Sequence, residues 1–124
     1  MSPEAESLEE PEKAMECLGD EYSIQILSLA LDDEKSAKEI SHDLDIPIAT
    51  VYRRVDDLVD AGFLDYEGKK LTNEGKRVKV YRCYIDEVKL YFEGSTPRLE
   101  VKKKSDAQKT IDKAWKNLRN SSEP

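Results

Sequence analysis

A proline at position 47 and a glycine at position 62 bracket the stretch that most constrains the fold of this 124-residue chain. Between them, apolar residues recur every three or four positions, which is the period of an α-helix. Proline suits the first turn of a helix, where an N–H would have no partner, and glycine suits the left-handed position just past the end. The segment therefore predicts a helix with one buried face, formed by Ile48, Val51, Val55 and Leu58.

The opposite face of this expected helix changes character along its length. Its first two turns carry no acidic residue, and the first acid is Asp56. A hydroxyl, a phenol and guanidinium groups are suited to base edges and phosphates when the N-terminal end of a helix enters a DNA major groove. We therefore expect only the first two turns to contact DNA, through Ile48, Ala49, Thr50, Tyr52, Arg53 and Arg54.

Two arginines on that face have different expected roles. Arg53 is expected to form a bidentate contact with a guanine, and Arg54 to bind a flanking phosphate, although the reverse assignment stays open. Tyr52 either contacts DNA or packs at the edge of the core. Because carboxylates lie unfavourably near phosphates, the aspartates at positions 56, 57 and 60 should mark the end of the contact.

The residues before position 47 predict further helices. A short helix is expected over 11–18, and Asp20 is a plausible N-cap for a helix over 21–31. Ser36 and Glu39 form a capping box that opens another short helix, which ends near position 44. Only three residues then precede the helix described first. Two short helices joined by such a turn, the second with a polar outer face, make a helix-turn-helix.

The period changes after Gly62. Residues 63–66 and 78–85 are β-prone, and the polar stretch between them has a turn at 73–75. A hairpin directly behind a helix-turn-helix is called a wing. Its basic residues are expected to bind phosphate, with one side chain in the minor groove: Lys69, Lys70, Lys76 and Arg77.

The C-terminal third predicts a second hairpin and a last helix. Strands are expected over 88–92 and around 99–101, and Ser105 with Gln108 resembles another capping box. A single winged helix reads few base pairs, whereas a two-fold dimer doubles the contacts. We therefore expect the apolar stripe of the last helix to form a homodimer interface through Ile111, Ala114, Trp115 and Leu118.

The fold class that follows is α+β: a winged helix-turn-helix, with a three-helix core plus a β wing, followed by an additional β-hairpin and a C-terminal helix. We expect residues 1–10 to form a disordered acidic arm and residues 11–92 the DNA-binding domain. The return strand and the dimerisation helix should occupy residues 93–120, and residues 121–124 should be a frayed tail.

Charge is distributed unevenly along the chain, whose formal net charge is −7. Residues 1–46 contain 3 basic and 14 acidic residues, whereas residues 47–82 contain 8 basic and 6 acidic ones. A locally positive face can bind a phosphate backbone even on an acidic protein, with strong salt dependence. Since the sequence has no membrane-spanning run and no signal pattern, we expect a cytoplasmic protein.

Other chemistries have little support in the sequence. Cys17 and Cys83 are most simply two reduced, partly buried thiols, and His42 a surface residue. We find no nucleophile beside a histidine, no glycine-rich phosphate loop and no HExxH motif, so we expect neither an enzyme nor a bound metal or cofactor. Nothing in the sequence indicates which small molecule, if any, acts as an effector.

Four runs in the chain together carry a family resemblance. These runs are LGDEY at 18–22, SAKEI at 36–40, ATVYRRV at 49–55 and AGFL at 61–64. The chain resembles an archaeal winged helix-turn-helix regulator of the ArsR-like group, and the resemblance implies a homodimeric, sequence-specific transcription regulator. Metal-sensing members carry a Cys-x-Cys pair on the helix before the recognition helix or at its start. Since 40–44 contains no cysteine, metal sensing is not implied for this chain.

The functional hypothesis is a transcription regulator that binds double-stranded DNA as a homodimer. The main alternative is a winged-helix module that binds another protein and no DNA, which the net acidity favours. A weaker alternative is a thiol- or metal-responsive repressor, which would require Cys17 and Cys83 to approach each other.

Overall fold

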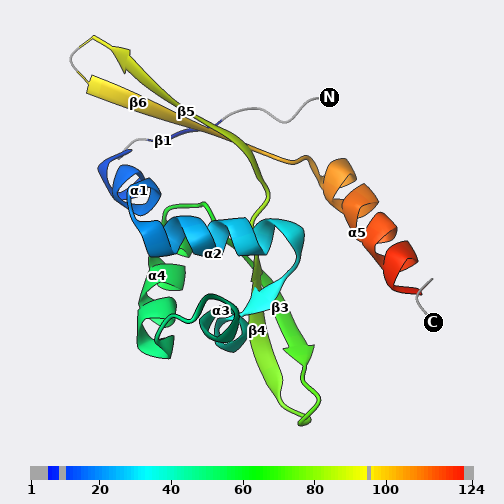
Figure 1. Cartoon of the computed structure of the whole chain (residues 1–124). Coiled ribbons are helices and arrows are strands. Elements are labelled where there is room, and N and C mark those ends of the chain that lie inside the picture. The colour runs from blue at the N-terminus through cyan, green and yellow to red at the C-terminus, as the bar shows by residue number, and fades with distance from the viewer. Residues whose placement is uncertain (1–5, 9–10, 95, 122–124) are drawn as a thin grey trace. The chain divides into compact units, whose positions relative to one another are not determined.

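The structure, a computed structural model, describes residues 6–8, 11–94 and 96–121 (Figure 1). The chain divides into two compact units. We call residues 9–84 the winged-helix unit and Met1–Leu8 with Ile85–Pro124 the hairpin unit. The division after residue 84 follows the pairing of the next strand along its whole length with the strand after it.

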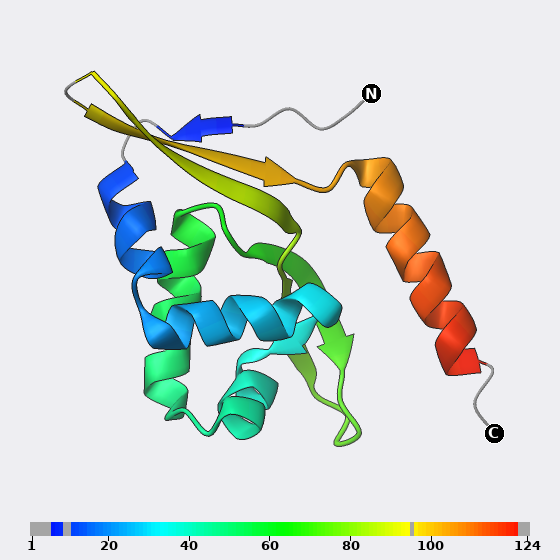
Figure 2. The ribbon, with the colours of Figure 1, turned by 45° about the horizontal axis from the view of Figure 1, so that its top comes forward.

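The winged-helix unit has the winged helix-turn-helix fold that the sequence predicts. Its strands form one antiparallel sheet in the order β2-β4-β3. Figure 2 shows the short turn that joins the third helix to the fourth, and the hairpin that follows them. The elements are α1 (Pro11–Leu18), α2 (Glu21–Asp32), β2 (Lys35–Ser36), α3 (Ala37–Leu44), α4 (Ile48–Asp60), β3 (Asp65–Leu71) and β4 (Arg77–Arg82).

The predicted glycine cap ends α4. Gly62 has a φ of 83°, and its N–H donates to the Val59 carbonyl at 3.0 Å. The Phe63 N–H donates to the Leu58 carbonyl at 2.9 Å, which completes a Schellman motif. Phe63 is fully buried, so the chain enters the wing from the core. On the inner face of α4, Val51, Val55 and Leu58 are buried, whereas Ile48 remains 39% exposed.

The two predicted caps on the preceding helices are also present. The Asp20 carboxylate accepts the Ser23 N–H at 2.8 Å at the start of α2. Ser36 and Glu39 form the reciprocal capping box of α3. Asp45 ends α3 in the left-handed region with a φ of 54°, and this allows the short turn into α4.

A buried arginine that we did not single out from the sequence joins α2 to the sheet. Arg82, at the end of β4, is 7% exposed. Its Nε donates to the Ala30 carbonyl at 3.0 Å, and its second terminal nitrogen, Nη2, donates to the Leu31 carbonyl at 2.9 Å. The last carbonyls of a helix lack partners within it and attract cations, so Arg82 caps the C-terminus of α2.

The wing differs from prediction in where its strands end. The β-prone run expected over 78–85 stops at Arg82 because the Cys83 N–H donates to the Ala30 carbonyl of α2 rather than to a strand. The pairing of β3 with β4 is irregular between Tyr66 and Gly68. Such a bulge strengthens the local twist of the hairpin.

The hairpin unit contains a three-stranded antiparallel sheet in the order β1-β6-β5, followed by one helix. Residues 1–10 were expected to be a disordered arm, but residues 6–8 pair with β6 as a strand. The Ser105 hydroxyl caps the helix by accepting the Gln108 N–H at 3.2 Å. The elements are β1 (Glu6–Leu8), β5 (Ile85–Glu93), β6 (Thr96–Lys103) and α5 (Asp106–Ser121).

Candidate nucleic-acid interface

The first two turns of α4 present their polar face to solvent. Tyr52 is 56% exposed, so it does not pack into the core, and Ala49 and Arg53 are exposed beside it. Thr50 is half-buried. The helix positions this face because its opposite stripe is anchored in the core. The surface therefore offers a hydroxyl, a phenol and a guanidinium group, as a major-groove contact requires.

Arg54 lies in a different environment from Arg53. Its Nε is 3.0 Å from the Asp20 carboxylate, and the side chain is 27% exposed. Asp20 is also the N-cap of α2, so the same carboxylate both caps α2 and pairs with a side chain of α4. Burial opposes ionisation of Asp20, but hydrogen bonds from Ser23 and the nearby Arg54 and Arg53 charges lower its pKa. Arg54 thus holds α4 against α2 within the fold.

The tip of the wing is a tight turn. The Thr72 N–H donates to the Lys76 carbonyl at 2.7 Å, and Gly75 has a φ of 81°. Lys69, Lys76 and Arg77 are exposed around this turn. Lys70 instead forms a salt bridge of 2.9 Å with Glu39, the capping-box residue of α3. The ion pair connects the wing to the helix-turn-helix, and Lys70 is the wing cation that is already paired.

A groove that the sequence did not reveal lies between the wing and the two helices of the helix-turn-helix. It encloses about 360 Å³. Lys38 from the first turn of α3 and Lys79 from β4 line it together with Tyr52. These lysines are far apart in the sequence and are brought together because β2, which directly precedes α3, pairs with β4. The groove adds two cations to the surface that joins α4 to the wing.

The two cysteines give no support to a thiol-responsive regulator. Neither Cys17 nor Cys83 forms a disulfide bond, and both are buried. Burial and the Asp57 carboxylate raise the pKa of the Cys17 thiol, which favours the protonated form over the nucleophilic thiolate. His42 is exposed and lies beside Asp43. Within the described residues, no cluster of histidine, cysteine and acidic side chains has the arrangement of a metal site.

The fold and the exposed face of α4 define a winged-helix protein with the features of a nucleic-acid binder. The family model described as "Sugar-specific transcriptional regulator TrmB" matches residues 21–85, just over half of the chain. The chain therefore belongs to the TrmB family and is a DNA-binding transcription regulator. The predicted class is confirmed, whereas the ArsR-like assignment and the archaeal origin stay predictions. The family is one of transcription regulators.

Comparison with other proteins adds one solved structure. The reduced form of HlyU from Vibrio cholerae is 17% identical in sequence, with a TM-score of 0.48. The match covers 86% of this chain and 85% of that one. No curated protein matches the chain. Among the helices that the structure describes, none is long and apolar enough to cross a membrane.

Proposed function

We propose that this regulator binds specific sequences in double-stranded DNA as a homodimer. The observation that carries the proposal is the two-faced start of α4. Val51 is fully buried there, whereas Tyr52 and Arg53 are exposed next to it. A helix anchored in this way can place its outer residues in a major groove without any change of fold.

Base reading and phosphate binding are assigned to different parts of the surface. Arg53 reads a guanine, and the small Ala49 lets the helix approach the bases closely. Ile48, Thr50 and Tyr52 complete the major-groove contact. The phosphates on either side are bound by the exposed cations of the wing and of the groove beside it: Lys69, Lys76, Arg77, Lys38 and Lys79.

Arg54 and Lys70 receive positioning roles in place of the phosphate contacts expected from the sequence. Each is engaged by a carboxylate at 3.0 Å or less, Arg54 by Asp20 and Lys70 by Glu39. Leaving those partners for a phosphate would expose an unpaired carboxylate close to the DNA. The two pairs instead fix the angle of α4 and of the wing.

The homodimer part of the proposal rests on α5. Its stripe is exposed by 50% at Ile111, 64% at Trp115 and 60% at Leu118, and the exposed Ala114 lies on the same stripe. Large aromatic residues at the centre of an interface contribute most to its affinity. A two-fold dimer would place two copies of α4 about 34 Å apart, one turn of DNA.

The description of the family as sugar-specific supports a further part of the proposal. We propose that a sugar is the effector that changes the DNA affinity of this regulator. A ligand changes an equilibrium only when it binds one state better than the other. The effect should therefore be measured on DNA binding with and without sugar.

The DNA proposal is tested by selecting bound sequences from random duplexes and then measuring affinity over a salt series. Recovery of an inverted repeat is expected, with affinity falling steeply as salt rises. Arg53→Ala should weaken binding to the selected site by about 1–3 kcal/mol and relax specificity at one base pair.

Lys89→Ala is the control, because Lys89 is exposed on β5 and belongs to no proposed contact. It should bind the selected site as the unmodified protein does. Absence of duplex binding even at low salt would overturn the proposal and favour a protein-binding module. Recovery of a single, unrepeated site would contradict the dimer alone.

A further inference from the structure

The three aspartates of α4 look alike in the sequence, but the structure gives them different surroundings. Asp57 is half-buried, and after burial its charge is the next cause that raises the pKa of the Cys17 thiol in α1. Asp60 lies 3.6 Å from the ammonium group of Lys13, which also belongs to α1. Asp56 is exposed, and in the part of the chain that the structure describes it forms no salt bridge. Asp56 is therefore the acid of α4 whose carboxylate is available to a ligand.

Asp56 lies one helical turn behind the two large side chains that the proposed function places in the major groove. Residues three and four apart are neighbours on a helix surface, so Asp56 adjoins both Tyr52 and Arg53. All three side chains are exposed. A helix rises about 1.5 Å per residue, so Asp56 is about 4.5 Å beyond Arg53 along the axis. Since base pairs are about 3.4 Å apart, Asp56 reaches the base pair next to the one that Arg53 reads.

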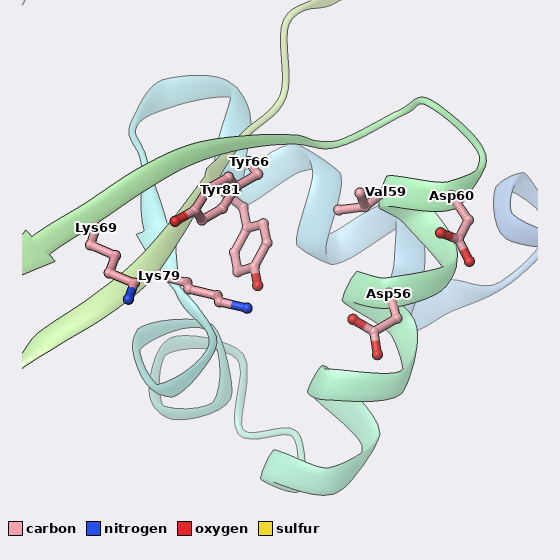
Figure 3. A pocket seen from close by; sticks show the side chains of 7 residues that line it. All are labelled: Asp56, Val59, Asp60, Tyr66, Lys69, Lys79 and Tyr81. Atoms are coloured by element: carbon pink, nitrogen blue, oxygen red, sulfur yellow. The ribbon is translucent and has the colours of Figure 1, made fainter.

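The wing places positive charge opposite Asp56. Asp56 borders a cleft of about 710 Å³, and Lys69, Lys79 and Tyr81 line its other wall. Figure 3 shows the Lys79 side chain extending from the wing toward α4. Burial and then the Asp56 charge raise the pKa of Tyr81, so the Asp56 charge acts on the wing. Within the described residues neither lysine forms a salt bridge. The two ammonium groups reduce the repulsion between the Asp56 carboxylate and DNA phosphates.

We propose that Asp56 determines specificity by accepting a hydrogen bond from the amino group of a cytosine, next to the guanine that Arg53 reads. The inference rests on the proposed function and adds one base pair to the recognised sequence. An ionised carboxylate only accepts hydrogen bonds. In the major groove, guanine offers acceptors and thymine an acceptor and a methyl group, whereas cytosine offers its amino donor. Adenine also has an amino group there, but its N7 acceptor lies beside it and repels a carboxylate. A carboxylate at this position therefore selects cytosine.

Base reading by Asp56 and simple repulsion by Asp56 have opposite consequences when the charge is removed. If Asp56 only repels phosphates, Asp56→Asn tightens binding to every duplex alike. If Asp56 reads a base, the same substitution changes which base is preferred. An asparagine amide both donates and accepts, which matches the N6 and N7 of adenine. Asp56→Asn should therefore exchange the preference for a C·G pair for a preference for an A·T pair at that one position.

The inference is tested by selecting bound sequences from random duplexes with the full chain and with Asp56→Asn. Affinity is then measured at one salt concentration on two duplexes that differ only at the pair next to the guanine. The unmodified protein should prefer C·G there by about tenfold, and Asp56→Asn should prefer A·T. The matched control is Asp57→Asn, which removes the same charge one residue further along α4 and outside the cleft. It should keep the preference for C·G.

The same selections separate this inference from the proposed function. If the unmodified protein enriches no sequence, the proposed function fails and the inference fails with it. If it enriches a sequence without a C·G pair beside the guanine, the inference alone is overturned. An unchanged C·G preference in Asp56→Asn, or equally tighter binding of both duplexes, would also overturn the inference and leave the regulator intact. Thermal unfolding of both variants should match that of the unmodified protein, since neither aspartate is buried.

Discussion

The two units of the chain differ in the solvent exposure of their apolar helix faces. In the winged-helix unit, the stripe of α4 is at most 1% exposed at Val51, Val55 and Leu58. In the hairpin unit, the stripe of α5 is at least 50% exposed at its three large residues. Both stripes have the same spacing in sequence. The difference shows that helical periodicity predicts an apolar face that needs to be covered. It does not identify what covers that face.

The winged-helix unit also pairs several polar groups across its own elements. Caps, ion pairs and the buried Arg82 connect its helices to one another and to the wing. The comparison therefore predicts that substitutions in this unit change its own stability, whereas substitutions on the α5 stripe change association.

The largest effect is expected at Arg82. Arg82→Ala removes two hydrogen bonds from a charged donor to the last carbonyls of α2 and leaves a cavity. We expect the free energy of unfolding to fall by about 3 kcal/mol, measured by urea denaturation. Arg77→Ala, at the exposed start of the same strand, should change it by less than about 0.5 kcal/mol. Equal effects of the two substitutions would contradict the capping role of Arg82.

The next effect tests the hairpin unit. Trp115→Ala should weaken self-association by about 2 kcal/mol, or roughly thirtyfold, because Trp115 is the largest side chain of the α5 stripe. Sedimentation equilibrium measures this, and the thermal unfolding of the winged-helix unit should stay the same. Asn117→Ala changes the opposite side of α5 and should leave association unaltered. A Trp115→Ala protein that associates normally would place the dimer interface elsewhere.

A smaller effect is expected at the N-cap of α2. Asp20→Ala should lower the free energy of unfolding by about 1 kcal/mol, whereas Asp20→Asn keeps the cap and removes only the ion pair with Arg54. Because the folded pKa of Asp20 lies below its ordinary 3.8, its contribution is complete above that pH. It is lost as pH falls through the folded value. The Asp20→Asn protein should not lose this stability in acid. If it and the unmodified protein show the same stability at every acid pH, Asp20 does not contribute in this way.

The smallest effect concerns the contact between the wing and α3. Lys70→Ala removes a partly exposed salt bridge with Glu39, and such pairs contribute about 0.2–1 kcal/mol. Thermal unfolding should shift little, while wing amides should become more dynamic in hydrogen exchange. Lys76→Ala, at the tip, should leave those amides unchanged. Loss of exchange protection in both variants alike would show that charge, and not the Glu39 pair, orders the wing.

Most of the fold could be predicted from short-range patterns in the sequence. The caps at Asp20 and Ser36 and the glycine at 62 act on helix ends within a few residues, so they are readable from sequence. The same is true of the outer face of α4, whose composition and helical period predict its exposure. The order of helices and wing then follows from the lengths of the connections.

The partners of individual charges were not readable in this way. Arg54 pairs with Asp20 and Lys70 with Glu39, and both carboxylates are distant from their partners in sequence. Residues 6–8 contain no strong strand signal, because their extended form depends on pairing with a distant strand. In the sequence, Arg82 looks like any charged residue at the end of a strand. Only the folded structure brings the end of α2 beside it.

The sequence by itself determined where helices begin and end, which residues of α4 face outward, and that the chain is a winged-helix regulator. These depend on local backbone preferences and on the helical period. Only the tertiary structure decided which cations are already paired, which lysines share a groove, and that carboxylates face lysines across a cleft. Those facts depend on contacts between residues distant in sequence, whose distances follow from packing and not from spacing along the chain.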